Sequence, residues 1–132
     1  MHDLNYISMD EWIKEAKKSE NADKIGMYLF HNGVVRRTSK ARVRYNDKSS
    51  EDVKKMDFIY DEGKVKKFVE QTYELPGVYY VRVWLNKGLL NVGDDLMYVL
   101  IGGDIRPHTV DALQFLVEKI KTECVGEHEI TA

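Results

Sequence analysis

Apolar residues recur along this chain with two spacings, one typical of helices and one typical of strands. Apolar residues three and four positions apart predict helices from about Met9 to Ser19, from Asp61-Glu62 to about Tyr73, and from Pro107 to Cys124. Short apolar runs and alternating patterns predict the strands. These are Ile25 to Arg37, Met56 to Tyr60, Val78 to Leu85, and Leu96 to Ile101. The order of elements predicts an α+β fold in one domain, residues 1–132, with a mainly antiparallel sheet and helices packed on it.

Local signals sharpen three of these elements. Ser8 precedes the first helix as a candidate N-cap, with Glu11 three residues later. The run Leu96 to Ile101 is apolar throughout, which predicts a strand at the centre of the sheet. In the last helix the predicted buried stripe consists of Val110, Leu113, Val117, Ile120 and Cys124. Gly126 is expected to end this helix, and the remaining residues are expected to form a tail.

Two segments leave alternatives open. Asn32-Gly33 is compatible with a hairpin turn or with a bulge inside one strand, and the short flanks favour a bulge or kink. Arg37 to Asp52 is rich in polar and basic residues, so we expect a mobile surface loop, with a short strand at Ala41 to Tyr45 as one option.

Composition and charge exclude several classes of protein. Lys and Arg number 20, Asp and Glu number 22, and a net charge of -2 disfavours a nucleic-acid binder. The arginine-rich segment is therefore interpreted as a solvated surface; it contains Arg36, Arg37, Arg42 and Arg44. One cysteine permits no intrachain disulfide and fits a cytoplasmic protein. Neither a signal peptide nor a membrane span is recognisable, and we expect no metal site and no resident cofactor.

Three cations carry the candidate chemistry. Lys121 borders the predicted apolar stripe, so its side chain either extends past the core into solvent or holds an anion in a half-buried pocket. Arg106 precedes the same helix, and the fifteen residues between the two positions span roughly 22 Å if helical. The two side chains can therefore surround one small molecule only across a subunit interface, so a site that they share would be a property of a dimer. Arg36 ends the first strand region.

Several short motifs in this order resemble the large, catalytic subunit of molybdopterin synthase. Asp94-Asp95 leads through a strand to Arg106, and the last helix carries a Q-F pair (Gln114-Phe115) and then Ile120-Lys121-Thr122, which resembles an L-K-T motif. Gly33-Val34-Val35-Arg36 is similar to the family's G-x-V-R strand. Tyr60 before a helix and Gly88 in a turn fit as well. The resemblance covers about Ile7 to Glu129.

The resemblance implies an α/β hammerhead fold and a central homodimer. It implies that each subunit binds a small ubiquitin-like sulfur carrier with a C-terminal Gly-Gly, and that the carrier's thiocarboxylate delivers sulfur to cyclic pyranopterin monophosphate. By the same resemblance Lys121 is the expected catalytic residue, and Arg36, Arg106 and His128 are the expected substrate-binding residues. Positive charge that positions an anionic substrate suits this chemistry.

Two departures from the family pattern keep a second hypothesis open. Ile105 stands where the family has a histidine before the arginine, and His128 stands where it has a second pocket lysine. The alternative is a non-catalytic paralogue, a dimeric binding module for a ubiquitin-like protein or a small anion. A cleft lined by Lys121, Arg36 and the partner subunit's Arg106 favours the enzyme. A Lys121 side chain splayed into solvent, or a cleft filled by Ile105, favours the module.

Overall fold

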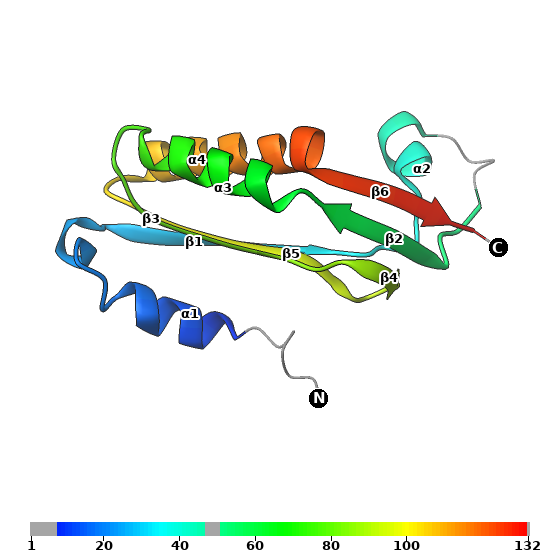
Figure 1. Cartoon of the computed structure of the whole chain (residues 1–132), viewed down its shortest axis with the longest axis horizontal. Coiled ribbons are helices and arrows are strands. Elements are labelled where there is room, and N and C mark those ends of the chain that lie inside the picture. Colours follow the sequence, from blue (N-terminus) through cyan, green and yellow to red (C-terminus); the bar gives the residue numbers. More distant parts are fainter. Residues whose placement is uncertain (1–7, 47–50, 132) are drawn as a thin grey trace.

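The strands form two antiparallel sheets that follow one another along the long axis of the molecule (Figure 1). The computed structural model describes residues 8–46 and 51–131. The first sheet has the order β1-β5-β3, with bounds Met27–Val34, Asp95–Gly103 and Val78–Leu85. The second has the order β4-β2-β6, with bounds Gly88–Asn91, Lys55–Tyr60 and Val125–Ile130.

Helices cover both faces of the first sheet (Figure 1). α3 (Glu62–Tyr73) and α4 (Arg106–Lys119) lie side by side on one face, and α1 (Met9–Ala16) covers the other. Shorter elements connect them: η2 (Ala22–Lys24), α2 (Lys40–Tyr45) and the π-helical turn η3 (Ile120–Cys124). This arrangement confirms the predicted α+β class with antiparallel sheets.

Side-chain caps fix where two helices begin. The Ser8 hydroxyl accepts a hydrogen bond from the Glu11 backbone N–H at 3.2 Å, as the sequence predicts. Asp61 caps α3 in the same way, because its carboxylate accepts from the Lys64 N–H at 3.1 Å. Each cap satisfies a backbone donor that the first helical turn leaves unpaired.

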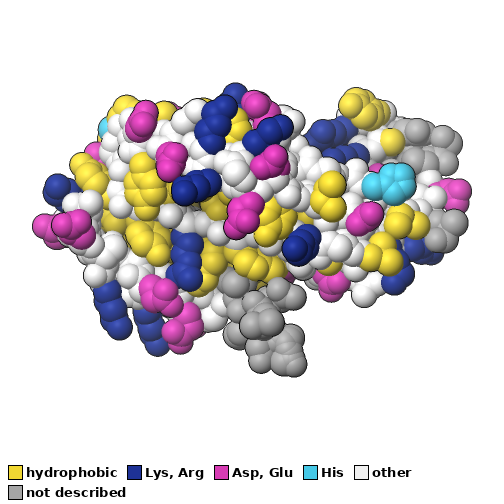
Figure 2. Space-filling view, in the orientation of Figure 1, with side chains coloured by type: hydrophobic (Ala, Val, Ile, Leu, Met, Phe, Trp, Pro, Cys, Tyr) yellow, Lys and Arg dark blue, Asp and Glu magenta, His cyan; other side chains and the backbone are white. Residues whose placement is uncertain are grey.

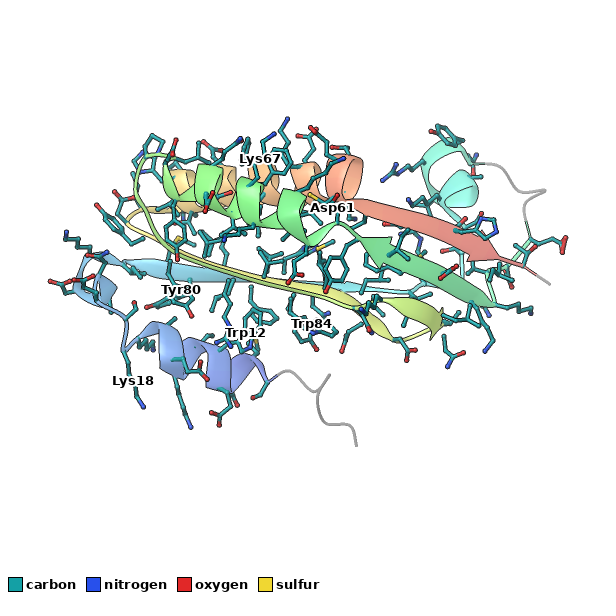
Figure 3. The ribbon with its side chains drawn as sticks, viewed as in Figure 1. Trp12, Lys18, Asp61, Lys67, Tyr80 and Trp84 are labelled. Atoms are coloured by element: carbon teal, nitrogen blue, oxygen red, sulfur yellow. The ribbon has the colours of Figure 1, made fainter. Side chains whose placement is uncertain are left out.

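Strand β5 is buried on both faces, which confirms its predicted central position. Val99 and Ile101 face the core under α3 and α4, whereas Leu100 faces α1 and packs with Trp12 and Ala16. Figure 3 shows Trp12 between α1 and the sheet, close to two further labelled aromatic rings, Tyr80 and Trp84. Alternate residues of one strand therefore serve two separate cores.

The Asn32-Gly33 pair does not turn the chain. β1 runs through both residues, and its pairing with β5 shifts register between Gly33 and Val34. The bulge that the short flanks favour is therefore confirmed, and it lies near the end of β1.

The predicted buried stripe of the last helix is wrong by one residue along most of its length. The structure buries Thr109, Ala112 and Leu116, whereas Val110, Leu113 and Val117 are only half-buried. The small residues face the sheet because the helix approaches β5 very closely. A Cβ on Gly103 would lie 2.2 Å from the Thr109 hydroxyl oxygen. The closeness of α4 to the β5 backbone therefore determines which face of the helix is buried, and the hydrophobic pattern alone did not indicate this face.

Three further expectations fail at secondary-structure level. The optional strand at Ala41 to Tyr45 is the helix α2, which suits a Lys-Ala-Arg composition. The expected tail is strand β6, which pairs with β2, and β4 was not predicted at all. Gly126 belongs to β6 and does not cap the helix; a Cβ there would lie 3.1 Å from Ile59. Residues 47–50 of the expected loop lie outside the described residues.

The close contact of α4 with β5 generates a prediction. Gly103→Ala forces a methyl group against Thr109, so we expect it to lower the free energy of unfolding by about 1–3 kcal/mol. Thr109→Ala should recover part of this loss in the double variant, because it removes the atom that the new methyl group meets. Urea denaturation of the four proteins in the double-mutant cycle measures the coupling. Strictly additive losses would contradict the contact.

Candidate functional site

A pocket of about 220 Å³ opens where β1 ends, and it brings Arg36 and Lys121 together. The residues come from five parts of the fold: the end of β1, the helix α2, strand β2 at Met56, the start of β5, and the η3–β6 segment. Figure 2 shows Lys and Arg side chains gathered at the notch between the helical layer and α2. The sequence predicted the two cations separately, and the structure places them at one cleft.

The bulge of β1 and two backbone hydrogen bonds hold Arg36 at this cleft. The neighbouring Val35 is buried, and its N–H donates to the Asp94 carbonyl at 2.9 Å. Its own carbonyl accepts from the Gly93 N–H at 2.8 Å. Arg36 itself is exposed, and its Nε donates to the Thr38 carbonyl at 3.0 Å. The guanidinium is thus supported at its Nε, and within residues 8–46 and 51–131 no other protein group bonds to its remaining N–H groups.

Lys121 occupies the π-helical turn that follows α4. Ile120 and Cys124 anchor the two ends of this turn in the core, and the Val125 N–H donates to the Ile120 carbonyl across it. Lys121 is exposed at the pocket rim, and within the described residues no carboxylate lies at ion-pair distance from its ammonium. A π turn in a helix frequently marks a functional position. Here it presents an unpaired cation at the cleft.

Acidic residues of β6 neutralise a third cation of the pocket, Lys40. The Lys40 ammonium lies 2.5 Å from a carboxylate oxygen of Glu127, and the Lys40 backbone N–H donates to Glu129 at 3.1 Å. These contacts fasten the start of α2 to β6. Glu127 pairs with the Lys40 ammonium, and Arg36, Arg44 and Lys121 remain as pocket cations able to attract an anion.

His31 is a pocket residue that the sequence analysis missed. It lies on β1 opposite Val99, and its ring lines the cleft together with Lys121. Burial, and secondly the positive charge of Lys121, hold the pKa of His31 below its ordinary value, so the ring is neutral at pH 7. The available signal was its position two residues before Gly33, since alternate residues of a strand share one face.

Arg106 does not line this pocket in a single chain. It is the first residue of α4, whereas Lys121 follows the last turn of that helix. A 14-residue helix is about 21 Å long, so the two side chains belong to opposite ends. Ile105 is 53% exposed beside Arg106 and does not fill the cleft.

His128 also lies elsewhere. It is exposed on β6 and lines a different hollow together with Asp57 and Ile59. Glu127 and Glu129, its neighbours in the strand, face the pocket, so strand alternation places His128 on the opposite side.

Asp104 and His108 form a carboxylate–imidazole pair at the start of α4. Asp104 Oδ1 lies 2.8 Å from His108 Nδ1 and accepts from the Ile105 N–H at 2.6 Å. The bond with His108 is the main cause that lowers the pKa of Asp104. Gly77 makes room for this pair, because a Cβ there would lie 2.2 Å from the Asp104 carboxylate.

The described residues contain neither a candidate metal-ion site nor a helix that could span a membrane. No group of three or more His, Cys, Asp or Glu side chains there is arranged to hold a metal ion. None of the helices described is both long and apolar enough to cross a membrane.

Comparisons with known proteins agree on one family. The structure is similar to that of molybdopterin synthase from Staphylococcus aureus, with a TM-score of 0.73 at 16% identity, covering 97% of this chain and 88% of that one. It is also similar to a molybdopterin biosynthesis MoaE protein from Burkholderia ambifaria MC40-6, with a TM-score of 0.70 at 16% identity over 97% and 82% of the two chains.

A third similar structure is a protein–protein complex of subunits 1 and 2 of the molybdopterin-converting factor from Helicobacter pylori 26695. Its TM-score is 0.65 at 15% identity, and the match covers 95% of this chain and 80% of that one. Comparison with curated proteins gives no sequence match. At such low identity the structural matches establish the fold.

The family itself is established by sequence. The profile described as "MoaE protein" matches residues 5–123, which is most of the 132-residue chain. The matched range includes Arg36, Arg106 and Lys121 and ends before β6. The chain therefore belongs to the MoaE protein family, and its role lies in molybdenum cofactor biosynthesis.

Proposed function

We propose that this chain is the catalytic large subunit of a molybdopterin synthase. It transfers sulfur from a thiocarboxylated ubiquitin-like carrier ending in Gly-Gly to cyclic pyranopterin monophosphate, in the cytoplasm. The observation that carries the proposal is the convergence of Arg36 and Lys121 on one cleft. An extended Gly-Gly tail has no side chains, so its narrow cross-section suits a pocket of about 220 Å³.

The chemistry asked of the pocket is mainly electrostatic. Each delivery forms a carbon–sulfur bond on the substrate and breaks the carbon–sulfur bond of the thiocarboxylate, and the donor leaves as a carboxylate. Oxygen replaces sulfur on the donor and sulfur replaces oxygen on the substrate, so no external oxidant or reductant is required. Lys121 is assigned the stabilisation of the negative charge that develops at the reacting atoms, and Arg36 is assigned the binding of the anionic substrate.

The proposal includes a homodimer with a composite site. Arg106 lies at the far end of α4 from Lys121, so an Arg106 that contacts the same substrate must come from the partner subunit. The complex of two subunits in the Helicobacter pylori structure supports a small carrier as the second partner of this chain. His128 remains a sequence-based prediction of a substrate contact, because its ring faces a different hollow in one chain.

Lys121→Ala tests the catalytic assignment. Removing the unpaired ammonium should slow sulfur transfer by at least about 100-fold. It should leave thermal stability unchanged, because the side chain is exposed. The measurement is a single-turnover reaction with thiocarboxylated carrier and cyclic pyranopterin monophosphate, in which mass spectrometry counts the sulfur atoms gained.

Lys119→Ala is the matched control for this variant. Lys119 also lies near the end of α4, but its ammonium is 3.4 Å from the Glu123 carboxylate and it does not line the pocket. This control should keep wild-type turnover. Retained turnover in Lys121→Ala would contradict the assignment. A wild-type chain that binds the carrier and transfers no sulfur would establish the non-catalytic binding module instead.

Mixed dimers test the composite site. Lys121→Ala and Arg106→Ala chains should each be inactive alone, but a mixed dimer contains one site with both cations intact. Random mixing of equal amounts should restore about a quarter of the wild-type sites. Arg37→Ala, which alters an exposed arginine 3.8 Å from Asp52, serves as the active control. A clean monomer by light scattering would contradict the dimer, and no recovery on mixing would contradict the composite site.

A further inference from the structure

His31 contains a buried polar atom that the folded chain leaves without a partner. Its Nε2 is inaccessible to solvent, and within the described residues no donor or acceptor lies at hydrogen-bond distance. This is the one side-chain atom of that kind in the part of the chain that the structure describes. Burying a polar atom without a hydrogen bond costs free energy, so such atoms are rare in folded proteins and call for an explanation.

The position of the ring points to the pocket. His31 lines the cleft that holds Arg36 and Lys121, and it also borders a second hollow over α4 at Leu113 and Val117. Its Nε2 lies beside Gly33, another residue that lines the cleft, because a Cβ built on Gly33 would be 3.8 Å from that nitrogen. A Cβ on Gly33 would contact both this ring and the Met97 side chain, which is 3.4 Å from it.

The charges around the ring decide what kind of ligand fits. Lys121 and Arg36 line the cleft together with the ring, and Glu118 lines the hollow over α4. The other charged residues of the cleft are Lys40, Arg44, Glu127 and Glu129. Lys121 and Arg36 offer only donors, so an incoming group that both cations attract must carry acceptor oxygens. The lowered pKa of His31 leaves a neutral ring, which can donate one hydrogen bond without adding a further positive charge.

We propose that His31 is a specificity-determining residue of this pocket, whose Nε2–H donates a hydrogen bond to an anionic oxygen held between Arg36 and Lys121. The inference rests on the proposed function and deepens it. Two groups of the proposed reaction carry such an oxygen: the carboxylate end of the carrier tail and the phosphate of the substrate. The shared chemistry is an anionic oxygen acceptor, and the experiment below separates the two sources.

His31 selects among ligands because of what happens when the acceptor is missing. A ligand that fills the cleft without an acceptor oxygen keeps Nε2 buried and unpaired, whereas an anion satisfies it. Sites with a buried polar group discriminate strongly against analogues that cannot pair with it. Arg36 and Lys121 attract any anion at long range. His31 adds the short-range requirement that the anion place an acceptor oxygen in line with its Nε2–H.

Imidazole NMR of the intact chain tests the proposal. Long-range ¹H–¹⁵N spectra report the protonation and tautomer of each ring, and the signal absent from His31→Gln identifies His31. Three probes are titrated separately: a peptide ending in Gly-Gly carboxylate, the same peptide as its amide, and inorganic phosphate. At least one anion should shift the His31 Nε2 resonance in a saturable way, and the amide should not. The His108 resonances serve as an internal control, because that ring lies at the other end of α4.

Affinities of two variants complete the test. His31→Phe keeps the ring volume and removes the hydrogen bond, so it should weaken binding of the responding anion by about tenfold. His31→Gln retains an N–H donor and should recover most of that loss, which a purely structural role for His31 would not predict. A response to the carboxylate peptide assigns the tail, and a response to phosphate assigns the substrate.

The outcomes that overturn the proposal separate it from the proposed function. Saturable anion binding with unchanged His31 signals, or with equal affinity in His31→Phe, overturns the role of His31 and leaves the proposed function intact. No saturable binding of either anion to the wild-type chain overturns both.

Discussion

The close packing of α4 on β5 fixes where the functional side chains lie. The contact of Thr109 with Gly103 sets the start of the helix directly over the end of the strand. From Thr109 the helix runs back along β5, and at 1.5 Å per residue it reaches Lys121 after about 18 Å. Six residues back along β5 cover about the same distance, which brings Lys121 over Met97. Because β1 pairs with β5, its end and Arg36 arrive at the same place.

This geometry also explains why a single chain provides only part of the proposed site. Arg106 marks the beginning of the run along β5 and Lys121 marks its end, so the helix length separates them. The separation is a consequence of the fold and cannot be removed by side-chain rotation. The resemblance to the family implies that Arg106 and Lys121 both contact the substrate. In this architecture they can do so at one site only if they come from different subunits of a dimer.

The sequence predicted the elements whose signals are local. Ser8 and the central strand Leu96 to Ile101 fall in this group, because capping chemistry and burial on two faces leave clear patterns. The buried face of α4 was missed because closeness to Gly103, a partner distant in sequence, selects Thr109 and Ala112. β6 was missed because its pairing with β2 is long-range and its alternation is between polar residues.

The candidate site divides in the same way. Arg36 and Lys121 were identified from motifs, since each motif is contiguous in sequence. Their convergence, and the presence of His31 and Lys40 beside them, depend on sheet pairing that no single segment encodes. His128 was assigned to the site from its position in the family pattern. A sequence position alone does not show which side of a strand a residue faces.

The π-helical turn at Ile120–Cys124 has a consequence for how this region can change in evolution. Such a turn accommodates one more residue than an α-helical turn. That extra residue also determines which alternate residues of β6 face the pocket. Deleting one residue there, with β6 still paired to β2, would exchange the two faces of the strand. The carboxylates of Glu127 and Glu129 would leave the pocket, and His128 would turn toward it. A single-residue deletion in one turn would thus reverse which charges line the cleft without changing the composition of β6.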